Sequence, residues 1–499
     1  MPDRSSDEQV REVLVLGGGT AGLLAALTLR LKLPSLAVRL VRSPDLGVIG
    51  VGEGTTPSFP THLHQYLGIP LARFHELVEP TWKLGIRFLW GPRKEFHYTF
   101  ATEFSIVYPG TSRAAVCYAG PGTRWTGAIS ALMRRGKACF RGPEGKPRLH
   151  PAIAYHVENQ RLVGGLEQLV REAGVEILDG TVAGVATDGD RVTSLRLEDG
   201  RDLRADLYLD ASGFRAELIG KALGIDTVSF SDALWCDRAI IGGWPRTGEA
   251  LVAHTTAETM NAGWCWQIEH EHWINRGYVY SSAWLDDDAA RAEFLAKNPQ
   301  VDPGSLRVVK FSSSRRKSLW VGNVVAIGNA SGFVEPLEAT AIQIICQQAR
   351  TLAGALTDSQ MRNSTPVRDL YNRYNLEQWD DVRDFLALHY RFNSRLDTPF
   401  WRAARHETPL HGSEALVDFW KEYGGAGSIG GILTKPASSF GLEGHFALLW
   451  GQDVPVRHPY EPPGAERAAY LRQLADDDRR ARQGLTLREA FSHLRTPVA

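Results

Sequence analysis

Apolar residues near the start of the chain change from strand spacing to helix spacing across a glycine-rich turn. Residues 13–16 form an uninterrupted apolar run, residues 17–22 read G-G-G-T-A-G, and apolar residues then recur at helical spacing. This order predicts a strand, a tight turn and a helix. In such a turn Gly17 permits the bend, Gly19 lets the backbone approach a pyrophosphate, and Gly22 lets the helix pack on the strand. The segment therefore predicts a dinucleotide-binding unit whose helix begins at an anion.

The next apolar segment, residues 37–41, runs into Arg42, where a dinucleotide fingerprint usually has an acidic ribose ligand. A guanidinium group suits a 2′-phosphate and an adenosine phosphate of FAD equally well. We favour FAD because residues 50–54 (G-V-G-E-G) form a second glycine-rich turn that can bring backbone donors close to a flavin. Glu53 is the candidate polar contact in this turn, and Gly54 follows it.

Further along the chain, strand patterns alternate with helical ones. Residues 162–170 have helical spacing, and strand patterns follow at 175–178, 192–197, 205–210, 244–282, 307–313 and 324–327. Beyond Ile342 the pattern is mostly helical. The order helix, strand, hairpin, strand is that of glutathione-reductase-type flavoproteins returning to their first sheet. We therefore expect an α/β, glutathione-reductase-type FAD-binding fold with an antiparallel substrate-side sheet and a mostly helical C-terminal region.

Two domains are expected from these patterns. Residues 1–345 form a core in which cofactor-binding and sheet parts interleave, and residues 346–499 form a helical region that covers the substrate. Within the core, residues from about 97 to 150 are rich in Gly, Pro and basic side chains, which indicates an irregular insertion.

Composition narrows the class of partner. The 499 residues are 43% hydrophobic and 23% charged, and 56 basic residues nearly balance 57 acidic ones. This balance leaves no electrostatic footprint for a nucleic acid or an anionic membrane, so a small molecule is the expected partner. The five cysteines contain no C-x-x-C pair, so neither a metal site nor a disulfide framework is expected. The polar N-terminus lacks a signal-peptide apolar region, which predicts a cytoplasmic location.

The motifs together resemble those of flavin-dependent halogenases, the tryptophan halogenase family. The resemblance runs from about Glu12 to Gln347. Its elements are the turn at Gly17, Gly19 and Gly22, Val51-Gly52-Glu53, Lys83, Asp210-x-Ser212-Gly213, the segment 263–268 (G-W-C-W-Q-I) and Glu335-Pro336-Leu337-Glu338. The glycine motifs alone are generic, whereas the W-x-W-x-I element combined with Lys83 and E-P-L-E is specific.

The resemblance implies a two-site reaction. Reduced FAD, delivered by a separate reductase, reacts with oxygen and halide to give hypohalous acid, which passes through a tunnel to Lys83. Lys83 either hydrogen-bonds this oxidant or carries it as a haloamine beside an aromatic substrate such as an indole. Glu338 stabilises the positively charged ring and removes its proton. The expected partners are thus the reductase, chloride or bromide and a small aromatic substrate, and a homodimer is allowed.

Further roles follow from the resemblance. Trp264 and Trp266 keep substrate away from the flavin, and the backbone amides of Thr340 and Ala341 bind halide. Glu335 lies three residues before Glu338 with Pro336 between them, so it need not share the same face, and we expect it to be structural or to support the site without contacting the substrate. The residues implied to bind the cofactor are Gly17, Gly19, Thr20, Ala21, Gly22, Arg42, Glu53, Gly54, Val182, Gly328, Asn329 and Ile342.

Two departures from the family pattern stand out. The family commonly has Ser-Thr-Gly after the second glutamate, where this chain has Ala339-Thr340-Ala341. A serine relay is therefore absent, and a non-glycine residue occupies the halide turn. The proline that closes W-x-W-x-I-P is replaced by Glu269, which we expect to alter the local turn without affecting Trp264 or Trp266.

Two other functions compete with halogenation. A flavin-dependent aromatic monooxygenase would need its substrate beside the flavin, and Lys83 and Glu338 would then have no obvious task. A catalytically silent flavin-binding partner protein would bind FAD without turning over a substrate.

Overall fold

The computed structural model describes residues 8–44, 47, 52–427 and 429–495, so Gly50 and Val51 of the second predicted glycine turn lie outside the described residues. The chain forms two compact units, each assembled from three separate segments. Unit 1 comprises Met1–Glu79, Val157–Phe230 and Ser312–Asp380, and unit 2 comprises Pro80–His156, Ser231–Phe311 and Asp381–Ala499. The predicted boundary after residue 345 falls inside helix α7 (Ala341–Asp358), so the chain is divided differently from the predicted 1–345 and 346–499.

A six-stranded sheet forms the centre of unit 1. Its order is β11 (Glu176–Asp179), β3 (Ala37–Arg42), β2 (Glu12–Leu16), β15 (Leu207–Asp210), β24 (Val324–Ala326) and β23 (Trp320–Val321). The first five strands are parallel, and β23 pairs antiparallel with β24. The apolar run at residues 13–16 is almost completely buried in the central strand, as expected of a parallel sheet.

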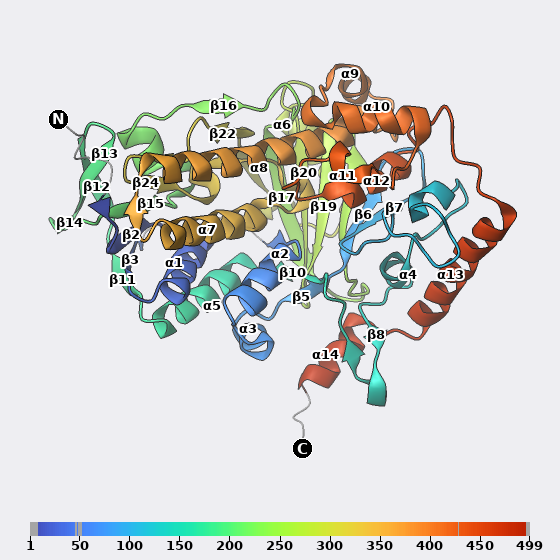
Figure 1. Ribbon diagram of the computed structural model, residues 1–499, viewed down its shortest axis with the longest axis horizontal. Coiled ribbons are helices and arrows are strands. Elements are labelled where there is room, and N and C mark those ends of the chain that lie inside the picture. Colours follow the sequence, from blue (N-terminus) through green and yellow to red (C-terminus); the bar gives the residue numbers. More distant parts are fainter. Residues whose placement is uncertain (1–7, 45–46, 48–51, 428, 496–499) are drawn as a thin grey trace. The chain divides into compact units, whose positions relative to one another are not determined.

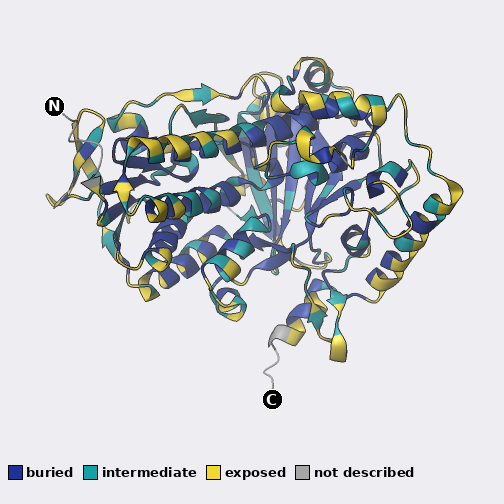
Figure 2. Cartoon of the chain, in the orientation of Figure 1, coloured by how far each residue is buried: buried dark blue, intermediate teal, exposed yellow. Residues whose placement is uncertain are grey.

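Helix α1 (Thr20–Lys32) packs against both α5 (Asn159–Glu172) and α7 (Figure 1). Its side chains are buried almost all round, because residues 22–29 are all inaccessible to solvent (Figure 2). Unit 1 also contains two three-stranded antiparallel sheets. One consists of β12 (Val182–Asp188), β13 (Arg191–Leu197) and β14 (Asp202–Leu203), and the other of β16 (Thr227–Ser229), β22 (Ser314–Arg316) and β25 (Gly332–Phe333). Its further strands are β1 (Glu8–Gln9), which pairs with β26 (Arg362–Asn363), and β4 (Glu53–Gly54), and its further helices include α2 (Ser58–Pro60) and α3 (Leu71–Val78).

Unit 2 contains the predicted antiparallel layer as a seven-stranded sheet. Its order is β21 (Arg307–Lys310), β17 (Arg238–Pro245), β20 (Trp273–Tyr280), β19 (Gly263–Glu269), β18 (Thr255–Met260), β6 (Gly85–Leu89) and β7 (Phe96–Thr99). The described neighbours pair antiparallel except β18 and β6, which are parallel. A separate antiparallel pair is formed by β5 (Thr81–Lys83) and β10 (Ala154–Val157), and another by β8 (Phe140–Arg141) and β9 (Pro147–Arg148).

The remainder of the chain is mostly helical, as the sequence predicts. Helix α8 (Thr365–Phe392) is followed by α9 (Pro399–Glu407), α10 (Glu414–Tyr423), α11 (Gly430–Leu433), α12 (Gly441–Gly451), α13 (Gly464–Arg482) and α14 (Leu487–Arg495), and unit 2 also contains α4 (Ala128–Arg134) and α6 (Asp287–Lys297). The segment predicted to be irregular, about 97–150, thus contains most of β7, the short helix α4, the β8–β9 hairpin and two 3₁₀ turns (Ala115–Tyr118 and Pro143–Gly145) between loops. Among the described helices, none is long and apolar enough to cross a membrane.

Candidate active site

The glycine turn after β2 has the geometry of a pyrophosphate cradle. Gly17 has a φ of +129°, and a Cβ atom on it would lie 2.2 Å from the Ala211 carbonyl oxygen. A Cβ atom on Gly22 would lie 1.9 Å from the Gly17 carbonyl oxygen. Gly19 differs, because none of the described residues places an atom within 4 Å of the position that its Cβ would take. Two glycines therefore shape the turn, and the third leaves its outer face open where helix α1 begins.

The N-terminus of α1 is also chemically suited to an anion. Gly19 is the N-cap residue, with no side-chain cap, and the first turn contains no acidic residue. The first N–H groups of a helix have no partner within the helix and carry partial positive charge. Thr20 and Ala21, both predicted to contact the cofactor, are the first two residues of this helix. The residues present thus fit the diphosphate of a dinucleotide.

A second glycine turn lies next to the first within unit 1. Gly328 follows β24 with a φ of +61°, and its Cβ position would lie 2.7 Å from Cβ of Ala21. Its backbone N–H donates a hydrogen bond of 2.9 Å to Oε1 of Gln348 on α7. Asn329 is part of the same short 3₁₀ turn, and Ile342 is buried in the first turn of α7. The structure therefore places Gly328 beside Ala21, so the two glycine turns are neighbours, and the cofactor contacts of Asn329 and Ile342 stay predictions.

Asp210 organises the turn at the end of β15. Its buried carboxylate accepts hydrogen bonds from Ser212 N (3.1 Å) and Oγ (2.6 Å), and from Leu218 N and Ile219 N (both 2.8 Å). Burial raises the pKa of Asp210, and these four hydrogen bonds act in the opposite direction. The D-x-S-G motif is thus a local hydrogen-bonding unit that fixes the chain beside Gly17.

Arg42 and Glu53 have protein partners that the sequence did not reveal. The Arg42 guanidinium forms ion pairs with Glu167 and, at 2.7 Å, with Asp179. Glu53 accepts a 3.2 Å hydrogen bond from Asn159 Nδ2, and burial raises the pKa of its carboxyl. The Arg42 guanidinium is thus already paired with two carboxylates, and its contact with a cofactor phosphate stays a prediction. Gly54 ends β4 and Val182 begins β12, and their cofactor contacts stay predictions.

The E-P-L-E segment leads directly into the N-terminus of α7. Glu335 and Glu338 are both buried, and Glu338 is the last residue of a short 3₁₀ turn. Ala339 has a φ of +57°, which redirects the chain, and the buried Thr340 is the N-cap of α7. Ala341, which replaces the family's glycine, does not have a positive φ. The alanine at this position therefore imposes no backbone strain on the predicted halide turn.

Lys83 is completely buried in unit 2. It ends strand β5, where it pairs with Ala154 of β10, and its Nζ lies 5.1 Å from the centre of the Phe100 ring. An isolated lysine in a sequence is usually at the surface. The burial of Lys83 is therefore unusual for a lysine and indicates a functional role.

Trp264 and Trp266 lie on one face of β19, with ring centroids 6.0 Å apart, and both are buried. Residue Gly277 of β20 is the cross-strand partner of Trp266. A Cβ atom on Gly277 would lie only 1.9 Å from the Trp266 ring, so the indole lies directly over this glycine. Sequence reasoning missed Gly277, although a glycine inside a strand often marks a close approach of this kind.

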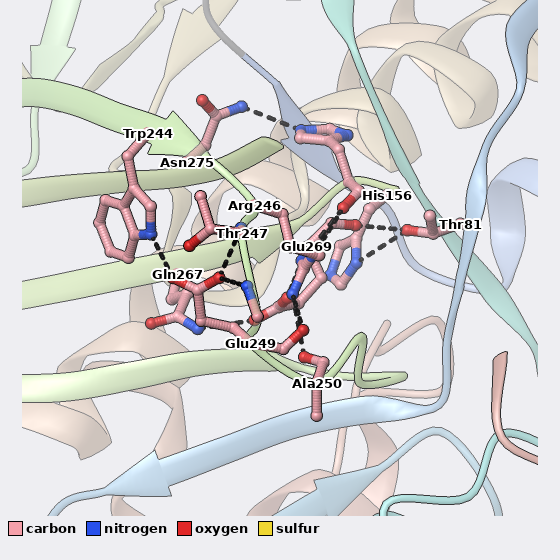
Figure 3. A network of polar contacts seen from close by, with 12 residues as sticks. Thr81, His156, Trp244, Arg246, Thr247, Glu249, Ala250, Gln267, Glu269 and Asn275 are labelled. Atoms are coloured by element: carbon pink, nitrogen blue, oxygen red, sulfur yellow. Dashed lines mark hydrogen bonds and ion pairs between the residues drawn. The ribbon is translucent and has the colours of Figure 1, made fainter. Parts of the chain in front are cut away.

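Glu269 does not disturb the strand that carries these tryptophans. It is the last residue of β19 and pairs with Ile274 across the hairpin. Its carboxylate forms an ion pair with Arg246, and both side chains are at most 2% exposed. Its carbonyl oxygen accepts a hydrogen bond from the Thr81 hydroxyl, two residues before Lys83 (Figure 3). The residue that replaces the family's proline thus belongs to a buried polar network.

Lys83 belongs to unit 2 and Glu338 to unit 1, and both side chains are buried. Their convergence on one chamber, and a passage from the flavin to it, stay predictions. The dinucleotide turn in a mixed α/β unit defines a dinucleotide-binding protein. The family model for tryptophan halogenase matches residues 12–464. The chain therefore belongs to the tryptophan halogenase family.

Individual relatives agree with this assignment. Tryptophan 7-halogenase RebH of Lentzea aerocolonigenes is 30% identical over 453 residues, covering 83% of this chain and 82% of RebH. Among solved structures, MibH, a lanthipeptide tryptophan 5-halogenase, is 38% identical, covers 100% of this chain and 95% of its own, and gives a TM-score of 0.88. Xcc4156, a flavin-dependent halogenase from Xanthomonas campestris, is 29% identical, covers 95% of each chain and gives a TM-score of 0.83. The chain is a flavin-dependent halogenase, and the monooxygenase and silent-partner alternatives are not favoured.

Proposed function

We propose that this halogenase acts on an indole at a site formed by Lys83 and Glu338, separate from its flavin. The observation that carries the proposal is the complete burial of Lys83 on a strand whose neighbouring positions form a hydrogen-bonded network. Removing a lysine side chain from water costs free energy. A need for the amine to react with a small oxidant away from solvent would explain why this lysine is nevertheless buried.

The flavin in this proposal is FAD, received as FADH2 from a separate reductase. The open face at Gly19 and the uncapped N-terminus of α1 fit its diphosphate, and Gly328 and Asn329 border the same turn. When bound, reduced FAD supplies hypohalous acid from oxygen and halide. The backbone N–H groups of Thr340 and Ala341, at the start of an 18-residue helix, are the proposed halide ligands.

At the second site Lys83 orients the hypohalous acid, or carries its halogen on the amine, toward one ring carbon. In the first route the carbon–halogen bond forms as the oxygen–halogen bond breaks, and the departing hydroxide takes a proton from the Lys83 ammonium to leave as water. In the second route water leaves when the nitrogen–halogen bond forms, and that bond breaks as the carbon–halogen bond forms. The ring proton then returns to the amine through Glu338. Glu338 stabilises the cationic ring and accepts the proton that the carbon loses. Trp264 and Trp266 keep the substrate away from the flavin, which prevents direct oxygenation.

The substrate class that we propose is a tryptophan side chain within a peptide. Support comes from the 38% identity to MibH over the whole chain, compared with 30% to RebH. A peptide substrate would need no recognition of a free amino acid's ammonium and carboxylate. Supplying a tryptophan-containing peptide, free tryptophan and indole in parallel, with bromide, distinguishes these substrates by the bromine isotope pair in the product.

Replacement of Lys83 by alanine tests the site. The Lys83→Ala variant is expected to lose at least about 100-fold in halogenated product, because the oxidant is no longer oriented. It should still form hypohalous acid, detected with a soluble halogen acceptor. Lys317→Ala, which removes an exposed lysine, is the control and should behave as wild type. Retained halogenation by Lys83→Ala would refute the proposed role, and a product with added oxygen would indicate a monooxygenase.

A further inference from the structure

We propose that Thr81, His156 and the Arg246–Glu269 ion pair are positioning residues that hold Lys83 in its reactive orientation. This inference rests on the proposed role of Lys83. All four residues belong to unit 2 and lie outside the residues that the family resemblance identified as reactive.

The register of β5 and β10 places His156 beside Lys83. Thr81 pairs with His156 and Lys83 pairs with Ala154. Side chains alternate between faces along a strand, so these four residues share one face of the pair. Ala154 has only a methyl group, which makes the diagonal neighbour His156 the larger group next to Lys83 on this face. Burial and, to a smaller extent, the positive charge of Lys83 lower the pKa of His156, and the contribution of Lys83 is consistent with the proximity of the two side chains.

At each hydrogen bond around His156, the donor and the acceptor can be assigned. The Thr81 hydroxyl donates its one hydrogen to the Glu269 carbonyl, so its oxygen can only accept from His156 Nδ1, at 3.5 Å. With Nδ1 protonated, a neutral imidazole accepts at Nε2, where the Thr255 hydroxyl lies at 2.8 Å. A neutral imidazole protonated at Nδ1 satisfies this chain, which fixes the tautomer of His156 beside the amine. The other titratable groups that act on His156 are His254 and His270.

The carbonyl at the end of this chain is itself immobilised. The Glu269 carboxylate binds Arg246 through one oxygen and accepts from Gln267 Nε2, at 2.6 Å, through the other. Arg246 also donates to the carbonyl oxygens of His270 (3.0 Å) and Ala250 (2.9 Å), as Figure 3 shows in part. A buried ion pair needs such additional hydrogen bonds, and removing one partner leaves an uncompensated charge.

The segment that follows Arg246 also binds the residue after Lys83. The backbone N–H of Leu84 donates a 2.8 Å hydrogen bond to the carbonyl of Ala253, in the segment between Arg246 and β18. Lys83 is thus fixed on both sides, by Thr81 through Glu269 and by Leu84 through Ala253. Glu269, where the family pattern has proline, supplies the charge that anchors this arrangement.

Thr81→Val tests the inference because it removes the hydroxyl while preserving the shape of the side chain. The reconstituted enzyme should give about tenfold less halogenated product per FADH2 oxidised, since a small misplacement of a reacting group has this effect. Released hypohalous acid should rise correspondingly, and Thr81→Ser should restore coupling. Thr259→Val is the matched control, because it removes a buried hydroxyl of β18 that donates to Leu89 O on the neighbouring strand β6 of the seven-stranded sheet (3.0 Å). Unchanged coupling in Thr81→Val would overturn the inference.

A second readout does not depend on turnover. The pH dependence of reductive methylation of Lys83 in FAD-free protein, read by peptide mass spectrometry, reports the titration of its amine. We expect its midpoint to move by about half a pH unit or more in Thr81→Val and His156→Gln, with no movement at Lys317. Identical midpoints in both variants and wild type would contradict the inference. If Thr81→Val fails to fold, Thr255→Val, which removes the donor to His156 Nε2, is measured in the same two assays.

The Lys83→Ala variant separates the two proposals. If Lys83→Ala still halogenates, the proposed function fails whatever Thr81→Val does. If Lys83→Ala is inactive while Thr81→Val and Glu269→Gln keep wild-type coupling and methylation profiles, only the positioning inference fails.

Discussion

The indole of Trp266 covers Gly277 on the neighbouring strand so closely that a Cβ atom on Gly277 would lie only 1.9 Å from the ring. The two residues are direct cross-strand partners in β19 and β20. No side chain larger than hydrogen at position 277 is compatible with the observed position of Trp266. The glycine therefore fixes the ring that we propose separates substrate from flavin.

Gly277→Ala is accordingly expected to displace Trp266. Overpacking of a buried site should lower the free energy of unfolding by about 1–3 kcal/mol. If Trp266 separates the two sites, halogenated product per FADH2 should also decrease. Urea unfolding followed by tryptophan fluorescence and a product-to-FADH2 ratio provide the measurements. Gly184→Ala is the control, because this strand glycine has no atom within 4 Å of its Cβ position. Equal stability of Gly277→Ala and wild type would show that the ring moves aside without cost.

The glycines of the first turn should separate folding from cofactor binding. Gly22→Ala places a methyl group 1.9 Å from the Gly17 carbonyl oxygen and should destabilise the FAD-free protein by several kcal/mol, on the order of a severe backbone clash. In the described part of the chain Gly19→Ala meets no atom within 4 Å, so the FAD-free variant should unfold within about 1 kcal/mol of wild type. Its affinity for FAD should nevertheless fall about tenfold or more, because the methyl group occupies the cradle. Fluorescence titration with FAD and urea unfolding measure the two effects, and unimpaired binding by Gly19→Ala would exclude a diphosphate at this face.

The fold and the cofactor turn could be predicted from local signals. A buried strand, three spaced glycines and a helical pattern lie within 20 residues, and each glycine has its own steric role. The division into units could not be predicted, because α7 continues helically through residue 345 and carries no mark of a boundary. Pairing between β6 and β18 joins segments about 170 residues apart, which periodicity cannot reveal.

The candidate site was only partly predictable for the same reason. Lys83 and Glu338 were found through the family resemblance, since nothing in their local sequence indicates burial. The partners Thr81, His156 and Arg246 come from three distant segments and meet only after folding. Glu269 was noted as a departure from the family pattern, but the expectation of an altered turn missed its ion pair. A buried Glu269 carboxylate would need a partner of opposite charge, so a basic partner such as an arginine could have been predicted for it.

Asp210→Asn should destabilise the turn beside the cofactor. Both carboxylate oxygens of Asp210 accept hydrogen bonds, one from Ser212 and the other from the backbone N–H groups of Leu218 and Ile219. In either orientation the NH2 group of an asparagine would face N–H or O–H donors instead of accepting from them, so these buried donors would lose their acceptor. The loss should be about 2–4 kcal/mol in the free energy of unfolding, measured by urea denaturation. Asp188→Asn, at the exposed end of β12, serves as the control, and a similar midpoint for both variants would contradict this assignment.

Glu103 should make the protein less stable as the pH rises. Burial raises the pKa of this carboxyl to about 7, although its oxygens accept from Ile129 N (2.6 Å) and Ser130 N (3.1 Å) at the start of α4. An unfolded glutamate ionises near pH 4.5, so between about pH 4.5 and 7 the folded protein binds the proton that the unfolded chain has lost. The associated stability is fully present below pH 4.5 and is lost as the pH rises through 7, by about 1–3 kcal/mol.

Glu103→Gln removes this titration and should unfold with a weaker pH dependence. Relative to wild type, its free energy of unfolding should therefore increase steadily from pH 5 to pH 8, as measured by urea denaturation at each pH. The exposed Glu407→Gln, on α9, should leave the wild-type pH profile unchanged. Because Glu443 lies close enough to raise the pKa of Glu103 further, Glu443→Gln should shift the same profile to lower pH. Parallel curves for wild type and Glu103→Gln would mean that this carboxyl ionises in the folded protein as it does in water.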